Sequence, residues 1–229
     1  EQAALDSGKT LTICFQNRYN GASHRMKELI DGGAMGKVVG GCAFVCWNRG
    51  GAYYGDSPWR GKWKTEGGSV LINQAIHTLD LMRWLSGGFE LKAASMSAKR
   101  LQDEIETEDT CDILFTNREG GRFLFYCSNC AAVNLPVQMH LILEKGEFHL
   151  DGSRLTIKDK DGVTFEDYAT ETKVGKDYWG SSHGVLIEDF YRRIQNGEAP
   201  YITPADALES TRLMEEAYLS SAESRRRPQ

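Results

Sequence analysis

Residues 109–128, DTCDILFTNREGGRFLFYCS, contain the pattern that decides the fold class. Two runs rich in β-branched and aromatic residues, 109–117 and 121–128, flank the turn signal Glu119-Gly120-Gly121. This arrangement is typical of a β-hairpin. Because the connection is short, the two strands are expected to run antiparallel.

The same pattern occurs on both sides of this hairpin. A strand is predicted before it over 92–99, and further strands are predicted after it over 136–144, 147–150, 153–158 and 163–168, with hairpin signals at Lys145-Gly146 and Asp161-Gly162. Nearer the N-terminus, strands are predicted over 10–16 and 37–47. Consecutive strands with short connections indicate a largely antiparallel sheet.

Helical patterns lie on both sides of these strands. They cover the end of a helix over 1–6, and helices over 22–31, 70–85, 183–196 and from Pro204 to about Ser221. Strands in the middle with helices toward both ends predict an α+β fold, in which helices pack on one face of an open, mostly antiparallel sheet.

Composition narrows the class of protein. The net charge of −5 and the pI near 5.6 argue against a nucleic-acid-binding surface, which needs basic charge. The longest stretch without a charged residue, Phe123 to Leu143, contains polar residues and a proline, so it predicts two strands and a loop and no membrane span. Six cysteines, with only one C-x-x-C pair, predict neither disulfides nor a metal site and favour a reducing, cytoplasmic location.

The helix over 70–85 is apolar nearly all round, which is typical of a buried helix. Asn73, Gln74, His77 and Asp80 interrupt this pattern, and Asn73 and His77 share a helix face because they are four residues apart. Buried polar groups need partners. The four residues form either a satisfied core network or a catalytic edge that faces a cleft, and their spacing alone favours neither.

Residues 48–69 form a predicted loop that is too long and too aromatic for a simple connector. Long loops in compact domains are usually functional or disordered, and aromatic residues among polar groups favour function here. Gly67, Gly68 and Ser69 open the following helix, either as a plain N-cap or as a site whose positive end faces an anion.

A nucleotide-binding fingerprint is missing from the sequence. No two glycines are separated by a single residue, so the G-x-G-x-x-G motif of dinucleotide-binding folds does not occur.

Several motifs together resemble the Gfo/Idh/MocA oxidoreductases, the family of glucose–fructose oxidoreductase and inositol 2-dehydrogenase, over nearly the whole chain. They are Phe15-Gln-Asn-Arg-Tyr-Asn20, the segment from Lys27 to Val38, Trp59-Arg-Gly61, Gly67-Gly68, Asn73-Gln-Ala-Ile-His77, Asp80, Trp84-Leu-Ser-Gly87, Asp189-Phe190, and the segment from Ser210 to Ser221. The block around His77 is specific to the family.

The resemblance implies that the chain is the C-terminal half of a two-domain protein. Residues 1–19 would be the last helix and strand of a Rossmann domain that is otherwise missing, and 20–229 would form the substrate-binding and oligomerisation domain. NAD or NADP would be bound mainly by the missing domain, and no residue of this chain is assigned to the cofactor. The family also implies a homo-oligomer formed through the open face of the sheet.

The resemblance assigns chemical roles to two residues of the helix over 70–85. His77 matches the catalytic histidine, which exchanges a proton with the substrate hydroxyl during hydride transfer, as suits an imidazole. Asn73 occupies a position where many members carry Asp, and its amide would orient the substrate. Asp80 would either fix the tautomer of His77 or serve as a cap or core residue.

Other residues are candidates for substrate binding. They are Arg18, Tyr54, Trp59, Arg60 and Gln74. Aromatic faces pack on sugar C–H surfaces, and arginine presents a fork suited to phosphate or carboxylate. Arg18 would touch substrate or cofactor, or form an interdomain salt bridge. The remaining histidines, His24, His140, His149 and His183, are expected in surface or core roles.

The expected function is the substrate-binding and catalytic half of an NAD(P)-dependent sugar or polyol dehydrogenase that acts on a sugar or nucleotide-linked sugar and is silent as an isolated fragment. The alternatives are a non-catalytic module for dimerisation or sugar binding, and a family member that uses NAD transiently in glycoside cleavage. No nucleic-acid or membrane partner is expected.

Overall fold

The structure, a computed structural model, describes residues 2–169 and 182–221. Its main feature is an eight-stranded sheet of order β2-β3-β4-β1-β5-β6-β7-β8. The strands are β1 (Val38–Cys46), β2 (Glu90–Ser97), β3 (Thr110–Thr116), β4 (Arg122–Ser128), β5 (Gln138–Leu143), β6 (Gly146–Asp151), β7 (Arg154–Asp159) and β8 (Gly162–Asp167). Neighbouring strands are antiparallel except β1 and β4, which run parallel.

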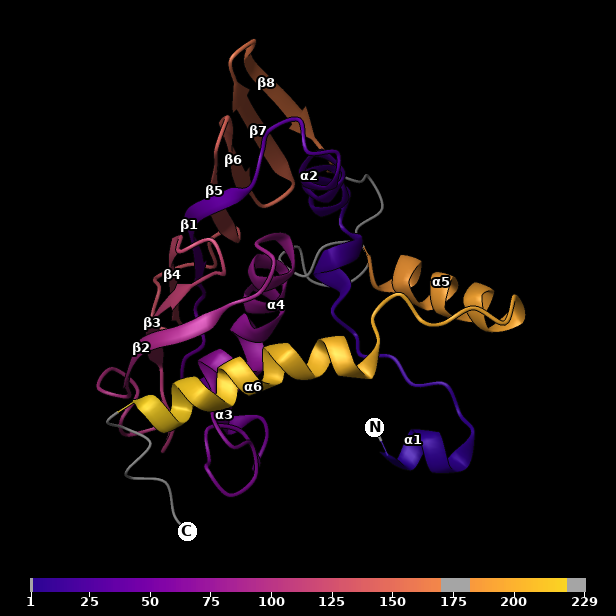
Figure 1. Cartoon of the computed structure of the whole chain (residues 1–229). Coiled ribbons are helices and arrows are strands. Elements are labelled where there is room, and N and C mark those ends of the chain that lie inside the picture. The colour runs from indigo at the N-terminus through magenta and orange to yellow at the C-terminus, as the bar shows by residue number, and fades with distance from the viewer. Residues whose placement is uncertain (1, 170–181, 222–229) are drawn as a thin grey trace.

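Helices cover one face of this sheet, as Figure 1 shows with the sheet seen nearly edge-on. The helical elements are α1 (Gln2–Ser7), η1 (Gln16–Tyr19), α2 (Gly21–Asp31), α3 (Gly51–Gly55), η2 (Val70–Ala75), α4 (Ile76–Leu85), α5 (His183–Gln195) and α6 (Pro204–Ser220). Of these, α2, α4 and α6 lie against the sheet, whereas α1 and α5 lie away from it. This arrangement confirms the predicted α+β fold.

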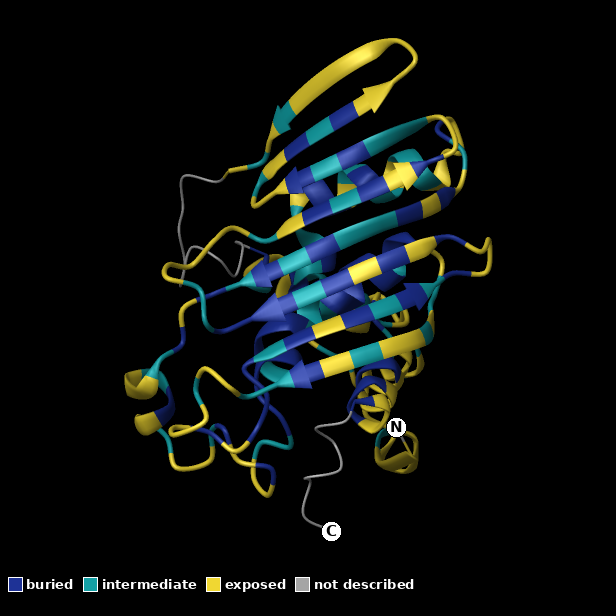
Figure 2. Ribbon diagram, turned by 90° about the vertical axis from the view of Figure 1, so that its left-hand side faces the viewer, coloured by how far each residue is buried: buried dark blue, intermediate teal, exposed yellow. Residues whose placement is uncertain are grey.

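The core lies between the sheet and these helices. Alternate residues of each central strand face it, for example Phe123 and Phe125 of β4, which pack in one cluster with Leu79 of α4 and Ala217 of α6. The opposite face of the sheet is open, and Figure 2 shows buried and exposed residues alternating along its strands. This period of two is the expected signature of a sheet covered on one side.

The predicted strands from residue 92 onward and the predicted hairpins are confirmed within one or two residues. The predicted strand over 10–16 is wrong, because no described strand lies beside this segment to pair with its backbone. Side chains of the segment make contacts instead: the Thr12 hydroxyl donates to the carbonyl of Ile202, and Phe15 packs on Ile202. Among the described residues, no helix is long and apolar enough to cross a membrane.

Candidate active site

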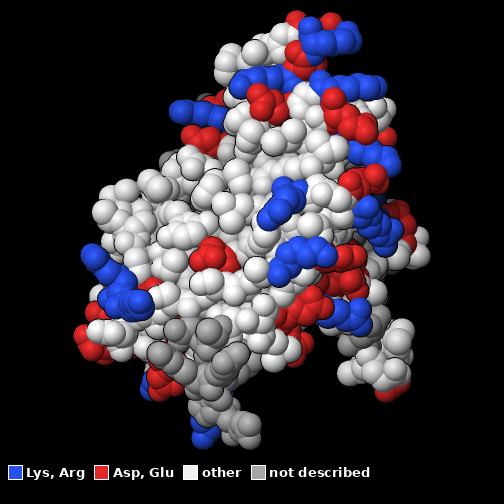
Figure 3. All heavy atoms as spheres, turned by 60° about the vertical axis from the view of Figure 1, so that its left-hand side comes forward, with Lys and Arg blue, Asp and Glu red and all other residues white. Residues whose placement is uncertain are grey.

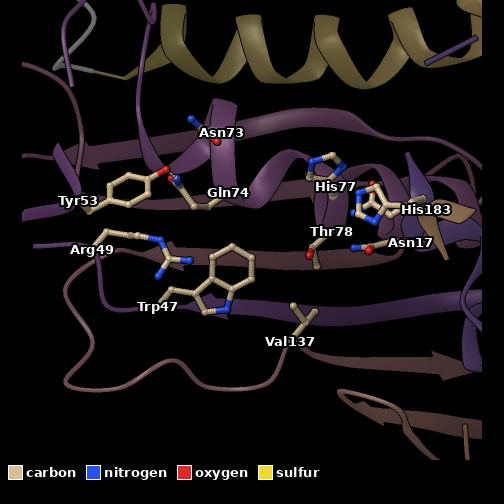
Figure 4. Close-up of a pocket in the computed structure, with 11 residues that line it drawn as sticks. Asn17, Trp47, Arg49, Tyr53, Asn73, Gln74, His77, Thr78, Val137 and His183 are labelled. Atoms are coloured by element: carbon tan, nitrogen blue, oxygen red, sulfur yellow. Dashed lines mark hydrogen bonds between the residues drawn. The ribbon is translucent and has the colours of Figure 1, made fainter. Parts of the chain in front are cut away.

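Two adjoining cavities share a wall formed by Asn73 and His77. The first has a volume of about 200 Å³ and is shown in Figure 4. It is lined by Gln16, Asn17, Trp47, Arg49, Tyr53, Asn73, Gln74, His77, Thr78, Val137 and His183. The second, more open to solvent, has a volume of about 380 Å³ and is lined by Trp59, Thr65, Glu66, Ile72, Asn73, Ile76 and His77.

The predicted helix over 70–85 begins as a π-helix, η2, and continues as the α-helix α4. π-Helical turns are rare and are frequently found at functional sites. Asn73 in η2 and His77 in α4 still face the same cavities, which confirms the predicted shared face. The Asn73 side chain donates a 2.7 Å hydrogen bond to Glu66, which ties η2 to the preceding loop.

Glu108, in the connection between β2 and β3, holds the start of η2. Its Oε1 accepts hydrogen bonds from the backbone N–H groups of Ser69 and Leu71 and from the Tyr218 hydroxyl, at 2.9, 3.0 and 2.7 Å. Burial raises the pKa of Glu108, whose Oε2 has no hydrogen-bond partner. The sequence left this helix end as either a plain N-cap or a site facing an anion, and in the structure the chain's own Glu108 carboxyl group occupies it.

Gly68 allows this packing. A Cβ atom there would lie 2.0 Å from the Tyr218 hydroxyl oxygen, so a larger residue would displace the tyrosine that bonds Glu108.

A chain of polar groups connects the loop to the helix behind the first cavity. Gln74 donates to the Tyr53 hydroxyl at 2.9 Å and accepts from Asn129 at 3.0 Å. Asn129 also donates to the Tyr54 hydroxyl at 2.7 Å, which in turn lies 2.6 Å from Ser69 Oγ. Burial raises the pKa of Tyr54 to about 12, so this hydroxyl stays protonated. The network fixes the Gln74 amide at the cavity wall.

Two arginines pack around Tyr53. The Arg49 guanidinium, in the wall of the first cavity, lies 5.1 Å from the Trp47 ring and 5.3 Å from the Tyr53 ring, and it donates to Asn134 Oδ1 at 2.9 Å. The Arg60 guanidinium lies 4.2 Å from the centre of the Tyr53 ring and donates to the Tyr53 carbonyl. The first cavity therefore presents one cation and two aromatic faces to a bound molecule.

His77 and His183 lie close together at the other end of the first cavity (Figure 4). Burial lowers the pKa of His77; the charge of Asp80 opposes this shift and His183 adds to it. His77 Nδ1 is buried and has no hydrogen-bond partner among the described residues. A neutral imidazole in a cavity wall is able to accept a proton from a hydroxyl bound beside it.

Arg18 and Asp80 belong to a buried ionic network beside the cavity. Arg18 donates to both carboxylate oxygens of Asp80 and also to Asp206. Ser210 donates to Asp80 at 2.7 Å, and Arg83 donates to Asp206 at 2.8 Å. The network joins η1, α4 and α6, and thereby positions Gln16 and Asn17, which precede Arg18 and line the first cavity.

Of the predicted site residues, His77, Asn73, Gln74 and Trp59 line the cavities. Tyr54, Arg18 and Arg60 are outside the cavity walls: the first two are buried in the networks described above, and Arg60 stacks on Tyr53. Asp80 forms no hydrogen bond with His77. It bonds Arg18 and Ser210 in the core, which is one of the two roles that the sequence left open for it.

Sequence reasoning missed Arg49, Trp47 and His183 as cavity residues. Trp47 is the last residue of the predicted strand 37–47, and Arg49 is the second residue of the predicted loop 48–69. Their position where a strand meets a long loop could therefore have indicated a site. His183 comes from α5, more than a hundred residues after His77, and no local pattern distinguishes it from a surface histidine.

Comparison with known families identifies the fold. The sequence pattern of the GFO/IDH/MocA C-terminal domain matches residues 23–149, which is more than half of the chain. The chain belongs to the Gfo/Idh/MocA family. No match was found among curated protein sequences.

Solved structures of this family have the same architecture. An oxidoreductase from Agrobacterium radiobacter, in complex with NAD+, L-tartaric acid and magnesium, has a TM-score of 0.82 at 18% identity over 96% of this chain and 65% of its own. The WlbA dehydrogenase from Bordetella pertussis, in complex with NADH and UDP-GlcNAcA, has a TM-score of 0.78 at 25% identity over 96% and 63%. The aldose-aldose oxidoreductase from Caulobacter crescentus, complexed with glycerol, has a TM-score of 0.79 at 19% identity over 97% and 65%.

The chain thus spans slightly less than two thirds of the length of these proteins. The family is one of oxidoreductases, and some of its members were crystallised with NAD+ or NADH.

Proposed function

We propose that this chain is the substrate-binding half of an NAD(P)-dependent dehydrogenase that acts on a secondary alcohol of a sugar or nucleotide-linked sugar. The single observation that carries the proposal is His77, with its lowered pKa and its buried, unpartnered Nδ1 in a wall shared by two cavities. Buried polar atoms normally have partners, so this nitrogen fits a role completed by a bound molecule.

The residues of the first cavity have separate roles in this proposal. The imidazole of His77 takes the proton from the substrate hydroxyl, because its lowered pKa keeps it neutral near pH 7. Asn73 and Gln74 orient the substrate through their amides. Trp47 and Tyr53 pack on apolar sugar faces, and Arg49 supplies a cation for a carboxylate or phosphate on the substrate.

The nicotinamide, when bound, would accept or supply the hydride at the substrate carbon. The sequence contains no G-x-G motif, so we assign binding of the dinucleotide to a separate Rossmann domain. In this proposal residues 1–19 are the remnant of that domain and 20–229 form the substrate domain. The lack of regular secondary structure over residues 9–15, where the sequence predicts a strand, supports this division. We also propose a cytoplasmic location, which the six free thiols support.

The open face of the sheet supports an oligomer. Leu124 and Ile142 are each 44% exposed there, and Figure 3 shows a broad area with few charged side chains, bordered by charges at its top and right. Exposed apolar patches often mark contacts between proteins. We propose a homo-oligomer that covers this face.

The experiment uses the full-length parent protein with NAD(P) and a panel of neutral, acidic and nucleotide-linked sugars. His77→Ala is expected to lower kcat by about 10²–10⁴-fold, whereas His24→Ala, which alters an exposed histidine, is expected to leave kcat unchanged. Wild-type turnover by His77→Ala would contradict the proposal. Release of free sugar without net NADH formation would favour the glycosidase-type alternative.

A second measurement separates the substrate domain from the cofactor domain. We expect the 229-residue chain alone to show no turnover and to bind NADH only weakly in a fluorescence titration. Micromolar affinity would overturn the division of roles.

A further inference from the structure

Two histidines face each other on the open side of the sheet. His140 of β5 and His149 of β6 are direct cross-strand partners, and their rings stack with centroids 3.9 Å apart and planes inclined by 17°. Their chain neighbours Leu141 and Phe148 are buried in the core. Because side chains alternate along a strand, both imidazoles point away from the helices.

Glu147 completes a cluster with this pair. It precedes His149 by two residues on β6 and therefore shares its face. Its Oε2 lies 2.8 Å from His140 Nε2 and 3.4 Å from His149 Nε2. The second distance exceeds the usual range for N–H···O hydrogen bonds, and His149 Nε2, shielded from solvent, has no hydrogen-bond partner. Two ring nitrogens thus turn toward one carboxylate oxygen that satisfies only one of them.

We propose that His140, Glu147 and His149 bind a divalent transition-metal ion of the zinc type. One ligand atom from each residue lies within 4.8 Å of the others, the only such grouping of three or more His, Cys, Asp or Glu residues in the described part of the chain. Imidazole and carboxylate are ligands of Zn²⁺, which usually takes four ligands in a tetrahedral arrangement. Three protein ligands leave the fourth position for water.

The scaffold suits a metal site. β5 pairs with β1 and β6, and β6 pairs with β5 and β7, so the ligands come from inner strands of the sheet. Sites on strands are held more exactly than sites on loops. Cross-strand Cβ atoms are typically about 4.5–5.5 Å apart, and the 2.8 Å contact between His140 and Glu147 shows that the ligand atoms already converge.

Lys158 of β7 competes for Glu147. Its Nζ lies 2.9 Å from Oε1, whereas the two histidines contact the other carboxylate oxygen, Oε2. It leaves Oε2 available to the ion, but its positive charge repels a second cation at short range. Removal of this lysine is therefore expected to tighten metal binding, whereas removal of any of the three ligands is expected to weaken it.

The cluster departs from the expectation of no metal site. Its ligands come from two different strands, and the Glu-x-His spacing of Glu147 and His149 does not match a familiar zinc-binding motif, so no sequence pattern indicated the site. It lies on β5 and β6, whereas the proposed active site is built from η2, α4 and the loop before them, on the other side of the sheet. A test that contradicts the metal site would therefore leave the proposed dehydrogenase function untouched, and the reverse also holds.

The test is calorimetric titration of the purified, metal-free 229-residue chain with ZnCl₂. One Zn²⁺ per chain is expected to bind. His140→Ala, His149→Ala and Glu147→Gln are each expected to weaken binding by at least about tenfold, since even indirect supporting partners of metal ligands account for 10–100-fold. Lys158→Met is expected to bind more tightly, and His24→Ala is expected to bind like the wild type.

Circular dichroism of each metal-free variant checks that it is folded, and Zn²⁺ is expected to raise Tm only where the three ligands are intact. Absence of saturable zinc binding by the wild type would overturn the proposal. So would undiminished binding by the double variant His140→Ala/His149→Ala, since the cysteines would then be the zinc ligands. Cobalt gives a further check, because its complex is expected to lack the charge-transfer absorption of a thiolate ligand.

Discussion

The guanidinium of Arg18 donates hydrogen bonds of 2.7 and 2.6 Å to the two carboxylate oxygens of Asp80, and neither side chain is exposed to solvent. The sequence had left two roles open for each residue: Arg18 as a contact to substrate or cofactor or as an interdomain salt bridge, and Asp80 as a partner of His77 or as a cap or core residue. Their mutual contact gives both a structural role, since it fixes η1 against α4 next to the cavity. A fork-shaped donor against a carboxylate is the geometry that makes arginine hard to replace.

Loss of this ion pair is expected to destabilise the fold. Arg18→Ala leaves Asp80 buried without its main partner, and breaking a buried pair costs about 3–5 kcal/mol. Urea denaturation of the 229-residue chain measures the change. Lys37→Ala, which breaks an exposed pair with Glu119, is the control and is expected to leave the urea midpoint nearly unchanged, because exposed ion pairs contribute little to stability. A similar small change for Arg18→Ala would contradict the structural role.

Tyr53 and Tyr54 are adjacent in the sequence, and we expect substitutions of the two to distinguish a cavity residue from a core residue. Tyr54→Phe removes a hydroxyl that contacts Ser69 and Asn129 inside the protein, and is expected to cost about 1–3 kcal/mol of unfolding free energy. Tyr53→Phe removes a hydroxyl at the cavity wall and is expected to raise KM in the full-length parent with little change in stability. The assignment fails if Tyr53→Phe proves the more destabilising of the two in urea.

Substitutions of Glu108 are expected to show that the stability of the start of η2 depends on one acceptor oxygen. Glu108→Ala removes the acceptor of three hydrogen bonds and is expected to cost at least about 2 kcal/mol. Glu108→Gln keeps that oxygen and is expected to be far milder.

The pH dependence of the Glu108→Gln variant has a definite sign. Since the folded state raises the pKa of Glu108 above 4.5, its stabilising contribution is present below pH 4.5 and is lost as pH rises through the folded pKa. The variant should therefore gain stability relative to the wild type between pH 4.5 and 7.5. Parallel pH curves for the two proteins would show that the pKa is not raised.

His77 is expected to make the fold sensitive to acid. Its pKa is below 6.5 in the folded state, so the unfolded chain binds the proton more readily and stability falls as pH decreases below 6.5. His77→Asn should make the fall between pH 7 and 5 shallower in urea titrations. His24→Asn, which alters an exposed histidine, is the control. If it changed the pH dependence of stability as much as His77→Asn does, the acid sensitivity would come from general surface charge and not from His77.

Most of the fold was predictable because it is local. Strands β3 and β4, and strands β5 to β8, are linked by turns whose glycines and polar residues mark them in the sequence. The segment 10–16 was mispredicted because its β-branched pattern carries no information about a partner strand. Likewise the π-helical start of the helix over 70–85 depends on Glu108, a distant residue that accepts from Ser69 and Leu71.

The candidate site was predictable only in part. His77 and Asn73 were recognisable because both lie on one helix next to a family motif. Arg49, Trp47 and His183 meet at the cavity through tertiary packing of β1, the loop and α5. Tyr53 and Tyr54 carry the same kind of side chain at adjacent positions, and only the backbone turn of α3 decides which one faces the cavity.

The position of β1 has a consequence for the order in which the molecule assembles. The sheet consists of two meanders, β2-β3-β4 and β5-β6-β7-β8, in which consecutive strands pair, and β1 joins them. Local contacts form quickly, whereas distant ones must first overcome the entropy of closing a long loop. We therefore expect the meanders to form early in folding and the insertion of β1 to limit the rate. The same late step brings Trp47 and Arg49 to the cavity, so the last contacts to form would be those that shape the binding site.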